Sequence, residues 1–309
     1  MSKSKKGKIM RNQNVDMLLD TLQILKQGQY EVNGKTVKLK LSAAEMRKAQ
    51  VLLPDDVYFI CRDADFEGTH KLGRCGFDCT NEDTFVATQY EDKILASLQK
   101  NPEKPVLVLN FANPVNPGGG VRIGARAQEE DLCRKSSLLL SLEGKQAMKY
   151  YEYNRKQNVY NSSDAMIFSP QVEVIRDKNG NLLDETMIAA VLTCAAPIVR
   201  TGEHCMEPEK YRNMVRQRIE GMLKCAAYFG YRYLVLGAWG CGVFGNDARI
   251  MSDLFFEVLR EMDYHGFDEK DLFDRIHFAV LDRSEEQKKF KEFYRNFGAE
   301  HYYQEAEEA

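Results

Sequence analysis

The sequence has no long apolar run and almost no charge excess. Within its 309 residues, no stretch approaches the roughly 20 apolar residues that a membrane-spanning helix needs. The basic start, residues 1–8, is not followed by the apolar segment of a secretory leader. The formal net charge of −3 also argues against a broad basic surface for nucleic acid. We therefore expect a cytoplasmic protein that binds no membrane and reads no nucleic-acid bases.

Several motifs that define common enzyme classes are missing as well. Neither of the two glycine-rich segments ends in the Gly-Lys-Ser/Thr of a Walker loop, and neither has a complete GxGxxG at a helix start. Nucleotide hydrolysis and hydride transfer therefore lose support. The histidines show no pairing with a nucleophile, and we assign no chemistry to them: His70, His204, His265, His277 and His301.

Disulfides and metal sites are poorly supported. The eight cysteines are spread along the chain and several lie inside apolar segments, which is typical of reduced thiols. His70, Cys75 and Cys79 could hold zinc, but their spacing is loose and no second pair follows. We interpret this segment as an ordinary loop, and we expect the protein to need no metal and no cofactor.

The N-terminal segment differs in pattern from the rest of the chain. Apolar residues recur at helical spacing between residues 15 and 25, and Gly28 ends this predicted helix. Asn33-Gly34 predicts a hairpin, and Ser42-Ala-Ala-Glu45 has the pattern of a capping box that opens a second helix. We divide the chain into an N-terminal accessory segment (1–53), a main domain (54–300) and an acidic tail (301–309).

From residue 54 on, short apolar runs alternate with amphipathic stretches. This alternation predicts an α/β layered domain with a mixed central sheet. The predicted strands are 57–61, 106–111, 166–168, 172–176, 187–195, 233–236 and 276–281. The predicted helices are 84–98, 129–142, 208–229, 248–262 and 285–297. Such sheets bind ligands at the carboxyl ends of their strands, where both glycine-rich segments fall.

Each of the two glycine-rich segments follows a predicted strand. Gly118-Gly119-Gly120 comes after the strand 106–111, and the segment 237–247 follows the strand 233–236. Glycine has no Cβ and allows positive φ, so successive backbone N–H groups can converge on phosphate or sugar oxygens. Either segment alone could be a tight turn, but together they favour a pocket for an anionic ligand.

Paired acids follow the triple glycine. Seven residues, 121–127, separate Gly120 from the tripeptide Gln128-Glu129-Glu130, which stands at an apparent helix start. The helix dipole alone favours carboxylates in a first turn. Beside the triple glycine and the upstream Asn113, however, we prefer to interpret them as the proton-transfer groups of an active site.

These residues carry a resemblance to a known family. Asn110-Phe-Ala-Asn113 with the triple glycine resembles the distal-ribose segment of macrodomains, and GGG-x7-QEE resembles the signature of bacterial-type poly(ADP-ribose) glycohydrolases. Residues 240–245 are similar to the diphosphate loop of that fold. The likeness includes residues 80–84, 169–170 and 195–197 and covers nearly the whole chain. It implies a three-layer α/β/α macrodomain-like fold with an N-terminal helical and hairpin extension.

The resemblance also implies roles for single residues. Glu130 would protonate the leaving ribosyl oxygen and then accept a proton from water. Glu129 would hold the hydroxyls of the ribose at the scissile bond. ADP-ribose would be bound by Asn113 and Phe244 at the distal ribose, by Gly118, Gly119, Gly120, Gly240, Cys241, Gly242 and Val243 along the diphosphate, by Gln128, and by Asp83 at the adenine amino group. Around Asp83, the sequence Asn-Glu-Asp-Thr departs from the usual macrodomain Gly-Asp-Ile-Thr.

The adjacency of the two acids limits the mechanism. Ordinary glycosidases place two carboxyls on opposite sides of the bond, about 5–9.5 Å apart. Side chains of neighbouring helical residues diverge by about 100°, so Glu129 and Glu130 cannot flank one bond in that way. A single carboxyl must therefore act first as acid and then as base, and the ligand's own diphosphate would stabilise the charged ribose.

The function implied by the resemblance is hydrolysis of ribose–ribose O-glycosidic bonds in poly(ADP-ribose), from chain ends and without a metal. The partners would be poly(ADP-ribose) or ADP-ribosylated macromolecules and the product ADP-ribose, and we expect a monomer. Two alternatives stay open. One is a non-catalytic ADP-ribose-binding macrodomain, and the other is a hydrolase of mono-ADP-ribosylated protein or nucleic acid.

Overall fold

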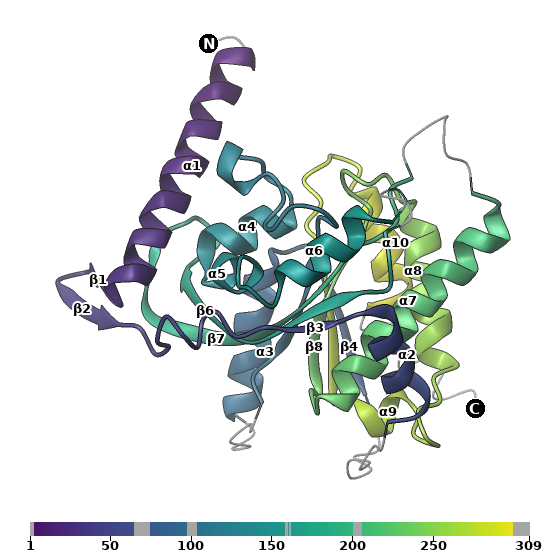
Figure 1. Ribbon diagram of the computed structural model, residues 1–309. Helices are drawn as coiled ribbons and strands as arrows, with labels where there is room; N and C mark the ends of the chain where they lie inside the picture. The colour runs from purple at the N-terminus through teal and green to yellow at the C-terminus, as the bar shows by residue number, and fades with distance from the viewer. Residues whose placement is uncertain are drawn as a thin grey trace.

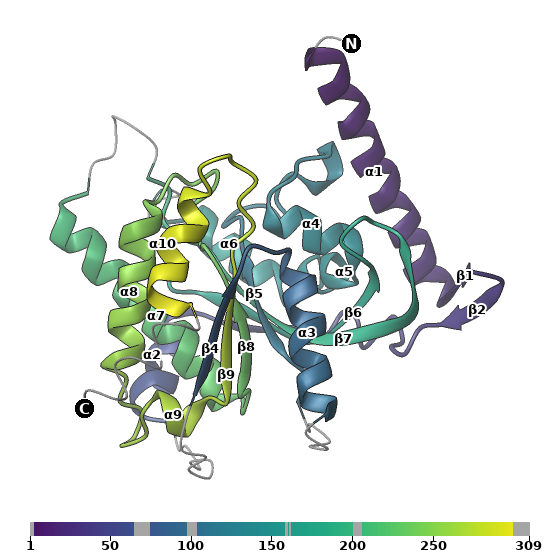
Figure 2. The same ribbon diagram turned by 180° about the vertical axis from the view of Figure 1, so that it is seen from behind.

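A mixed sheet forms the centre of the molecule. The structure is a computed structural model that describes residues 3–64, 75–97, 104–157, 160, 162–199 and 206–298, with side chains from residue 11 onward. Seven strands lie in the order β3-β6-β7-β5-β8-β9-β4, and their labels can be found in the two opposite views (Figure 1; Figure 2). They are β3 (Gln50–Leu52), β4 (Gly76–Thr80), β5 (Leu107–Phe111), β6 (Met166–Arg176), β7 (Leu182–Cys194), β8 (Tyr233–Leu236) and β9 (Arg275–Ala279). The strands from β7 to β4 are parallel, whereas β6 is antiparallel to both β3 and β7, which confirms the predicted mixed sheet.

Helices cover both faces of this sheet, as the two opposite views show (Figure 1; Figure 2). One face carries α2 (Pro54–Arg62), α7 (Pro208–Tyr228), α8 (Ala248–Arg260) and α10 (Lys288–Phe297). The other face carries α3 (Thr84–Ser97), α4 (Gln128–Lys135), α5 (Leu138–Leu142) and α6 (Met148–Arg155), with α1 (Lys3–Gln27) packed against α4. Two short helices, η1 (Val121–Ile123) and α9 (Glu269–Leu272), lie in connections. The predicted three-layer α/β/α arrangement is confirmed.

The apolar run before the triple glycine shows how the sequence builds these layers. In β5, Leu107 and Leu109 pack into the core on the α7 and α8 side, whereas Val106, just before the strand, and Val108 pack on the α3 and α4 side. Successive side chains of a strand point to opposite faces, so a strand that is buried on both faces must be apolar throughout. This strand then delivers the chain to the glycines.

The segment 57–61 is helical and belongs to α2, so the predicted strand is wrong. Pro54 occupies the first helical turn, and the Asp56 carboxylate accepts a hydrogen bond from the Leu53 N–H at 2.8 Å. Val57 and Ile60, three residues apart, are the buried positions. A five-residue apolar run is compatible with either a strand or a helix. Here Pro54 and Asp56, which precede the run, favour the start of a helix.

Two other differences from prediction lie close to serine residues. Ser42 and Glu45 make the expected capping contacts, but only turns follow, because the chain is extended again at β3. The predicted helix 129–142 is split between α4 and α5. At the break, Ser136 is extended, and Ser137 exchanges hydrogen bonds with the backbone of Glu173 in β6.

Residues 76–80 form the edge strand β4, where we expected a loop. Phe77 and Cys79 are buried and alternate with more exposed neighbours, a pattern too short to identify from sequence. Cys75 and Cys79 are buried free thiols, whereas His70 lies outside the described residues. All cysteines in the described ranges are unpaired.

The N-terminal segment packs closely on the rest of the molecule. β1 (Gln29–Val32) and β2 (Lys35–Lys38) form the predicted hairpin, and Asn33 and Gly34 have φ values of 51° and 74°, as a type I′ turn requires. Thr21 of α1 donates a hydrogen bond to the Arg134 carbonyl at 2.6 Å. β3, at the end of the segment 1–53, is a strand of the main sheet. No helix in the part of the chain that the structure describes is long and apolar enough to cross a membrane.

Candidate active site

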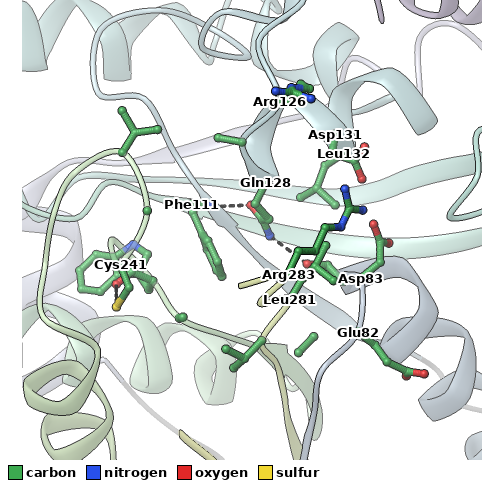
Figure 3. A pocket seen from close by; sticks show the side chains of 18 of the residues that line it. Glu82, Asp83, Phe111, Arg126, Gln128, Asp131, Leu132, Cys241, Leu281 and Arg283 are labelled. Carbon is green, nitrogen blue, oxygen red and sulfur yellow. Dashed lines mark hydrogen bonds between the residues drawn. The ribbon is translucent and has the colours of Figure 1, made fainter. Parts of the chain in front are cut away.

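A cavity of about 770 Å³ opens at the carboxyl ends of the parallel strands (Figure 3). Its walls come from Phe111 at the end of β5 and from the chain that follows β4, β8 and β9. This is the edge at which open α/β sheets bind ligands, and the volume falls within the usual range for a small-molecule site.

The second glycine-rich segment forms one wall of this cavity. Gly240 has a φ of 76°, and a Cβ there would lie 2.6 Å from the Ala196 Cβ. The Asn246 side chain fixes the loop by donating hydrogen bonds to the carbonyls of Pro197 at 2.8 Å and Gly240 at 3.0 Å. By contrast, a Cβ on Gly242 would meet nothing within 4 Å. The loop is thus held from behind and leaves space on its cavity side.

The first glycine-rich segment is filled by the acids themselves. Gly118 and Gly119 have φ values of 66° and 56°. A Cβ on Gly119 would lie 2.5 Å from Oε1 of Glu130 and 3.1 Å from Oε2 of Glu129. The Gly120 N–H donates a hydrogen bond of 2.8 Å to the same Oε1 of Glu130. The glycines therefore provide the room in which the two carboxyls sit.

Glu129 is enclosed in a cage of hydrogen bonds. Its side chain accepts from the Asn113 N–H at 2.7 Å and from the Asn110 amide at 3.3 Å, and only 2% of the residue is exposed. Burial raises the pKa of Glu129 from 4.5 to about 8, although these hydrogen bonds oppose the rise. Glu129 is thus held firmly in one orientation.

Glu130 has one anchored and one unpartnered oxygen. Oε1 is held by Gly120, whereas the buried Oε2 has no hydrogen-bond partner among the described residues. Buried polar atoms are nearly always hydrogen-bonded, so Oε2 stands out as an oxygen that the described residues leave unsatisfied. Glu130 is thus held through one oxygen only.

The structure places the sequence-predicted residues in two groups that meet at Gln128. Asp83, Gln128 and the loop residues Gly240, Cys241, Gly242, Val243 and Phe244 line the cavity. Asn113, Gly118, Gly119, Gly120, Glu129 and Glu130 form the hydrogen-bonded cluster next to Gln128 on α4. The acids are thus buried at the beginning of a helix whose next turns face the cavity.

Asp83 has protein partners inside the cavity wall. It accepts hydrogen bonds from the buried Lys135 ammonium at 2.9 Å and from the Phe85 N–H at 3.0 Å. Burial alone would raise the pKa of Asp83, but Lys135 outweighs it and the net shift is downward. Lys135 also binds Asp131 at 2.5 Å. A charged carboxylate is therefore available at the place where an acceptor was predicted.

Sequence reasoning found Gln128 but missed the rest of its face of α4. Asp131, Leu132 and Lys135 line the cavity together with Gln128, at the spacing of one helical stripe. That spacing was readable once Gln128 was placed at the site. Arg126 and Arg283 also line the cavity, and Figure 3 shows them with Asp83 and Asp131 around it.

Helix α1 also contributes to the cavity, which the sequence did not indicate. Asn14 and Met17 lie in its wall. The Asn14 amide donates a hydrogen bond of 3.0 Å to the carbonyl of Gly124, which follows η1. The chain after the triple glycine is therefore braced by the N-terminal segment.

One cluster has the residue types of a metal site. Asp78, Glu91 and His277 bring their ligand atoms within 4.8 Å of one another. The Arg275 guanidinium, however, binds both oxygens of Glu91 at 2.6 and 3.1 Å, and His277 contacts the same carboxylate at 3.0 Å. A positive charge already satisfies Glu91, so we interpret the cluster as a buried ion-pair network.

Comparison with known proteins agrees with this site. A family model described as the microbial-type PARG catalytic domain matches residues 19–177. A structure of poly(ADP-ribose) glycohydrolase from Thermomonospora curvata is 31% identical, with a TM-score of 0.81, and the match covers 93% of this chain and 100% of that chain. The chain belongs to the microbial-type PARG family. It is accordingly a glycosidase of the poly(ADP-ribose) glycohydrolase class.

Two further PARG structures contain ligands. The Thermomonospora curvata enzyme bound to the inhibitor ADP-HPD matches with a TM-score of 0.79 and 31% identity over 93% of this chain and 100% of that chain. The Deinococcus radiodurans enzyme in complex with ADP-ribose matches with a TM-score of 0.67 and 32% identity over 84% of this chain and 98% of that chain. Comparison with curated proteins gave no significant match.

Proposed function

We propose that this protein shortens poly(ADP-ribose) from chain ends, hydrolysing the terminal ribose–ribose bond and releasing ADP-ribose. Membership of the PARG family and a cavity of about 770 Å³, which suits one terminal unit, support this proposal. The observation that carries it is Glu130, a buried carboxyl with one oxygen anchored by Gly120 and the other unpartnered.

In the proposed reaction, Glu130 is the only proton carrier. Its Oε2 gives a proton to the ribosyl oxygen as the glycosidic carbon–oxygen bond breaks. A water then attacks the same carbon and returns its proton to Glu130. Glu129, held by the Asn113 N–H, would orient the hydroxyls of the reacting ribose. The two carboxyls converge at Gly119, contrary to the divergence expected from the helix geometry, but Glu129 is hydrogen-bonded through both oxygens and Glu130 through only one among the described residues, so we assign the proton to Glu130.

The remaining contacts of ADP-ribose follow from the cavity wall. We assign the diphosphate mainly to the second glycine-rich segment, and the open space at Gly242 supports that assignment, whereas the first segment is filled by the carboxyls of the two acids. Phe244 and Asn113 would contact the distal ribose, and Asp83, whose pKa Lys135 lowers, would accept from the adenine amino group. We further propose that the protein works as a cytoplasmic monomer without metal or cofactor.

The decisive experiment is Glu130→Gln, which keeps the shape of the side chain and removes the proton. Turnover of labelled polymer should be lost, whereas calorimetric titration with ADP-ribose should give nearly unchanged affinity. Glu152→Gln, the same change at an exposed position of α6, serves as the matched control and should keep full activity. Retained turnover in Glu130→Gln would overturn the assignment.

The substrate is tested by offering purified protein three substrates in parallel. These are poly(ADP-ribose), mono-ADP-ribosylated protein and mono-ADP-ribosylated DNA. We expect release of ADP-ribose from polymer chain ends and little from the other two. Binding without any release would identify a non-catalytic reader, and release only from mono-modified substrates would identify the other class of hydrolase.

A further inference from the structure

The edge of β5 that faces β8 is only partly paired. β5 pairs with β7 from Leu107 to Phe111, but with β8 only at Leu107 and Val108. The Val106 carbonyl accepts a hydrogen bond from the Ala190 N–H of β7, and the Ala112 N–H donates to the Cys194 carbonyl of β7. The backbone N–H and C=O groups of the even-numbered residues therefore face β7. The odd-numbered positions, Leu109 and Phe111, therefore direct their backbone groups to the other edge, beyond the end of the β8 pairing.

The carboxamide of Gln128 occupies this edge. Its Oε1 accepts from the Phe111 N–H at 2.9 Å (Figure 3). Its Nε2 donates to the Leu109 carbonyl at 2.8 Å. A third contact joins Nε2 to the Thr84 hydroxyl at 3.4 Å. In a parallel pair, a residue of the adjacent strand makes the same two bonds to residues i and i+2. The side chain thus takes the place of a strand residue.

This arrangement depends on the chemistry of a primary amide. The group offers one donor and one acceptor side by side, which match the Leu109 carbonyl and the Phe111 N–H. An ionised glutamate would place an acceptor against the Leu109 carbonyl, and an apolar side chain would leave both backbone groups unpaired. Both Nε2 hydrogens are used within the protein, so little of this carboxamide is left for a ligand.

The next two residues of α4 continue the attachment. Glu129 binds the Asn113 N–H and Glu130 binds the Gly120 N–H. Three consecutive residues of one helix are therefore tied to successive points of the chain that runs from β5 to the triple glycine. A rotation of α4 about its axis would break all three contacts and turn both acids away from the reacting bond.

We propose that Gln128 is a positioning residue that completes the sheet edge and sets the direction in which Glu129 and Glu130 leave α4. The proposal rests on the proposed role of Glu130. Its first test is Gln128→Met, which keeps the side-chain length and removes both hydrogen bonds. A misplacement of the acid by about 1 Å should lower kcat on labelled polymer about 100-fold. KM and the Kd of ADP-ribose should change less than threefold, roughly, because the cavity wall is otherwise intact.

A second variant gives a signature that a purely structural residue would not. In Gln128→Glu, a protonated carboxyl again offers one donor and one acceptor, whereas the ionised form does not. The kcat of this variant relative to the unmodified protein should therefore recover as the pH is lowered from 8 to 5. Hydrogen exchange of the peptide that contains Phe111 should be faster in Gln128→Met. Gln217→Met, on the exposed side of α7, is the matched control.

The outcomes separate this proposal from the proposed function. Full kcat in Gln128→Met, or a pH profile of Gln128→Glu parallel to that of the unmodified protein, overturns the positioning role. If Gln128→Met does not fold, the pH profile of Gln128→Glu decides alone. If Glu130→Gln remains active, the proposed function fails. If Glu130→Gln is inactive and Gln128→Met keeps full activity, the proposed function is supported and only the positioning role of Gln128 is ruled out.

Discussion

The two glycine-rich segments look alike in sequence, yet their glycines make room for different neighbours. A Cβ on Gly119 of the first segment would collide with Glu130, and a Cβ on Gly118 would lie 2.8 Å from Leu139. A Cβ on Gly242 of the second segment would stand in open space on the cavity wall. The first loop is filled by the protein's own carboxyls, and the second leaves space for a ligand. A glycine run therefore shows where side chains are excluded, but not what fills the space.

The strongest test of this contrast is Gly119→Ala. The added methyl group would displace the Glu130 carboxyl, and we expect kcat to fall about 100-fold or more, with ADP-ribose affinity changed only slightly. The variant also strains the backbone, because Gly119 has a φ of 56°. Gly266→Ala controls for that strain, since Gly266 has a φ of 82° with nothing within 4 Å of a Cβ. Equal activity losses in the two variants would contradict our explanation.

The second test is Gly242→Val, which should act on affinity. Its branched side chain would enter the space assigned to the diphosphate, and we expect the Kd of ADP-ribose to rise about tenfold or more, a change of about 1.4 kcal/mol. The melting temperature should stay unchanged, because a Cβ there meets no protein atom. Calorimetric titration measures the effect, with Ala43→Val in an exposed turn as the control. An unchanged Kd would remove the second loop from the diphosphate site.

The third test concerns what holds the second loop. Asn246 donates to the carbonyls of Pro197 and Gly240 and accepts from the Tyr211 hydroxyl at 2.7 Å. Asn246→Ala leaves these buried groups without partners, so we expect about 1–3 kcal/mol of lost stability. ADP-ribose affinity should fall by a few-fold only. Chemical denaturation measures the loss of stability, and calorimetric titration measures the change in ADP-ribose affinity. A loss of kcat without a loss of affinity would contradict our view that the second loop binds the ligand and the first loop places the acids.

The fourth test is a pH dependence that comes from Glu129. Because burial raises its pKa from 4.5 to about 8, the folded state prefers the protonated form. Its stabilising contribution is complete below about pH 4.5 and is lost as the pH rises through about 8. Thermal unfolding between pH 5 and 8 should therefore show a decline in melting temperature, and Glu129→Gln should decline less. Parallel curves for the two proteins would place the titration elsewhere.

Much of the fold and part of the site could be predicted from the sequence. The strand at Leu107–Phe111, the Asn33-Gly34 hairpin and the helix from Pro208 carry strong local signals, and all three are found. The short strand β4 and the helix α2 were missed, because runs of five residues carry little periodicity. The two acids and both glycine loops were found by their spacing.

The contacts that give these residues their roles depend on the folded chain. Nothing in the sequence around Lys135 indicates that its ammonium binds Asp83, which is 52 residues away. The sequence likewise does not indicate that the Asn14 amide binds the Gly124 carbonyl, or that the carboxamide of Gln128 binds the backbone at the edge of β5. Local patterns identify elements, whereas partners across the sheet are fixed only when the layers assemble.

The position of α1 has a consequence for any shortened version of the protein. The family match begins at residue 19, but Asn14 and Met17 belong to the cavity wall. A fragment that starts at residue 19 would keep every motif of the family and still lack the amide that braces Gly124. A fragment that starts at residue 54 would also lose β3 from the sheet. Recombinant fragments that begin where the family match begins would therefore leave the cavity without part of its wall.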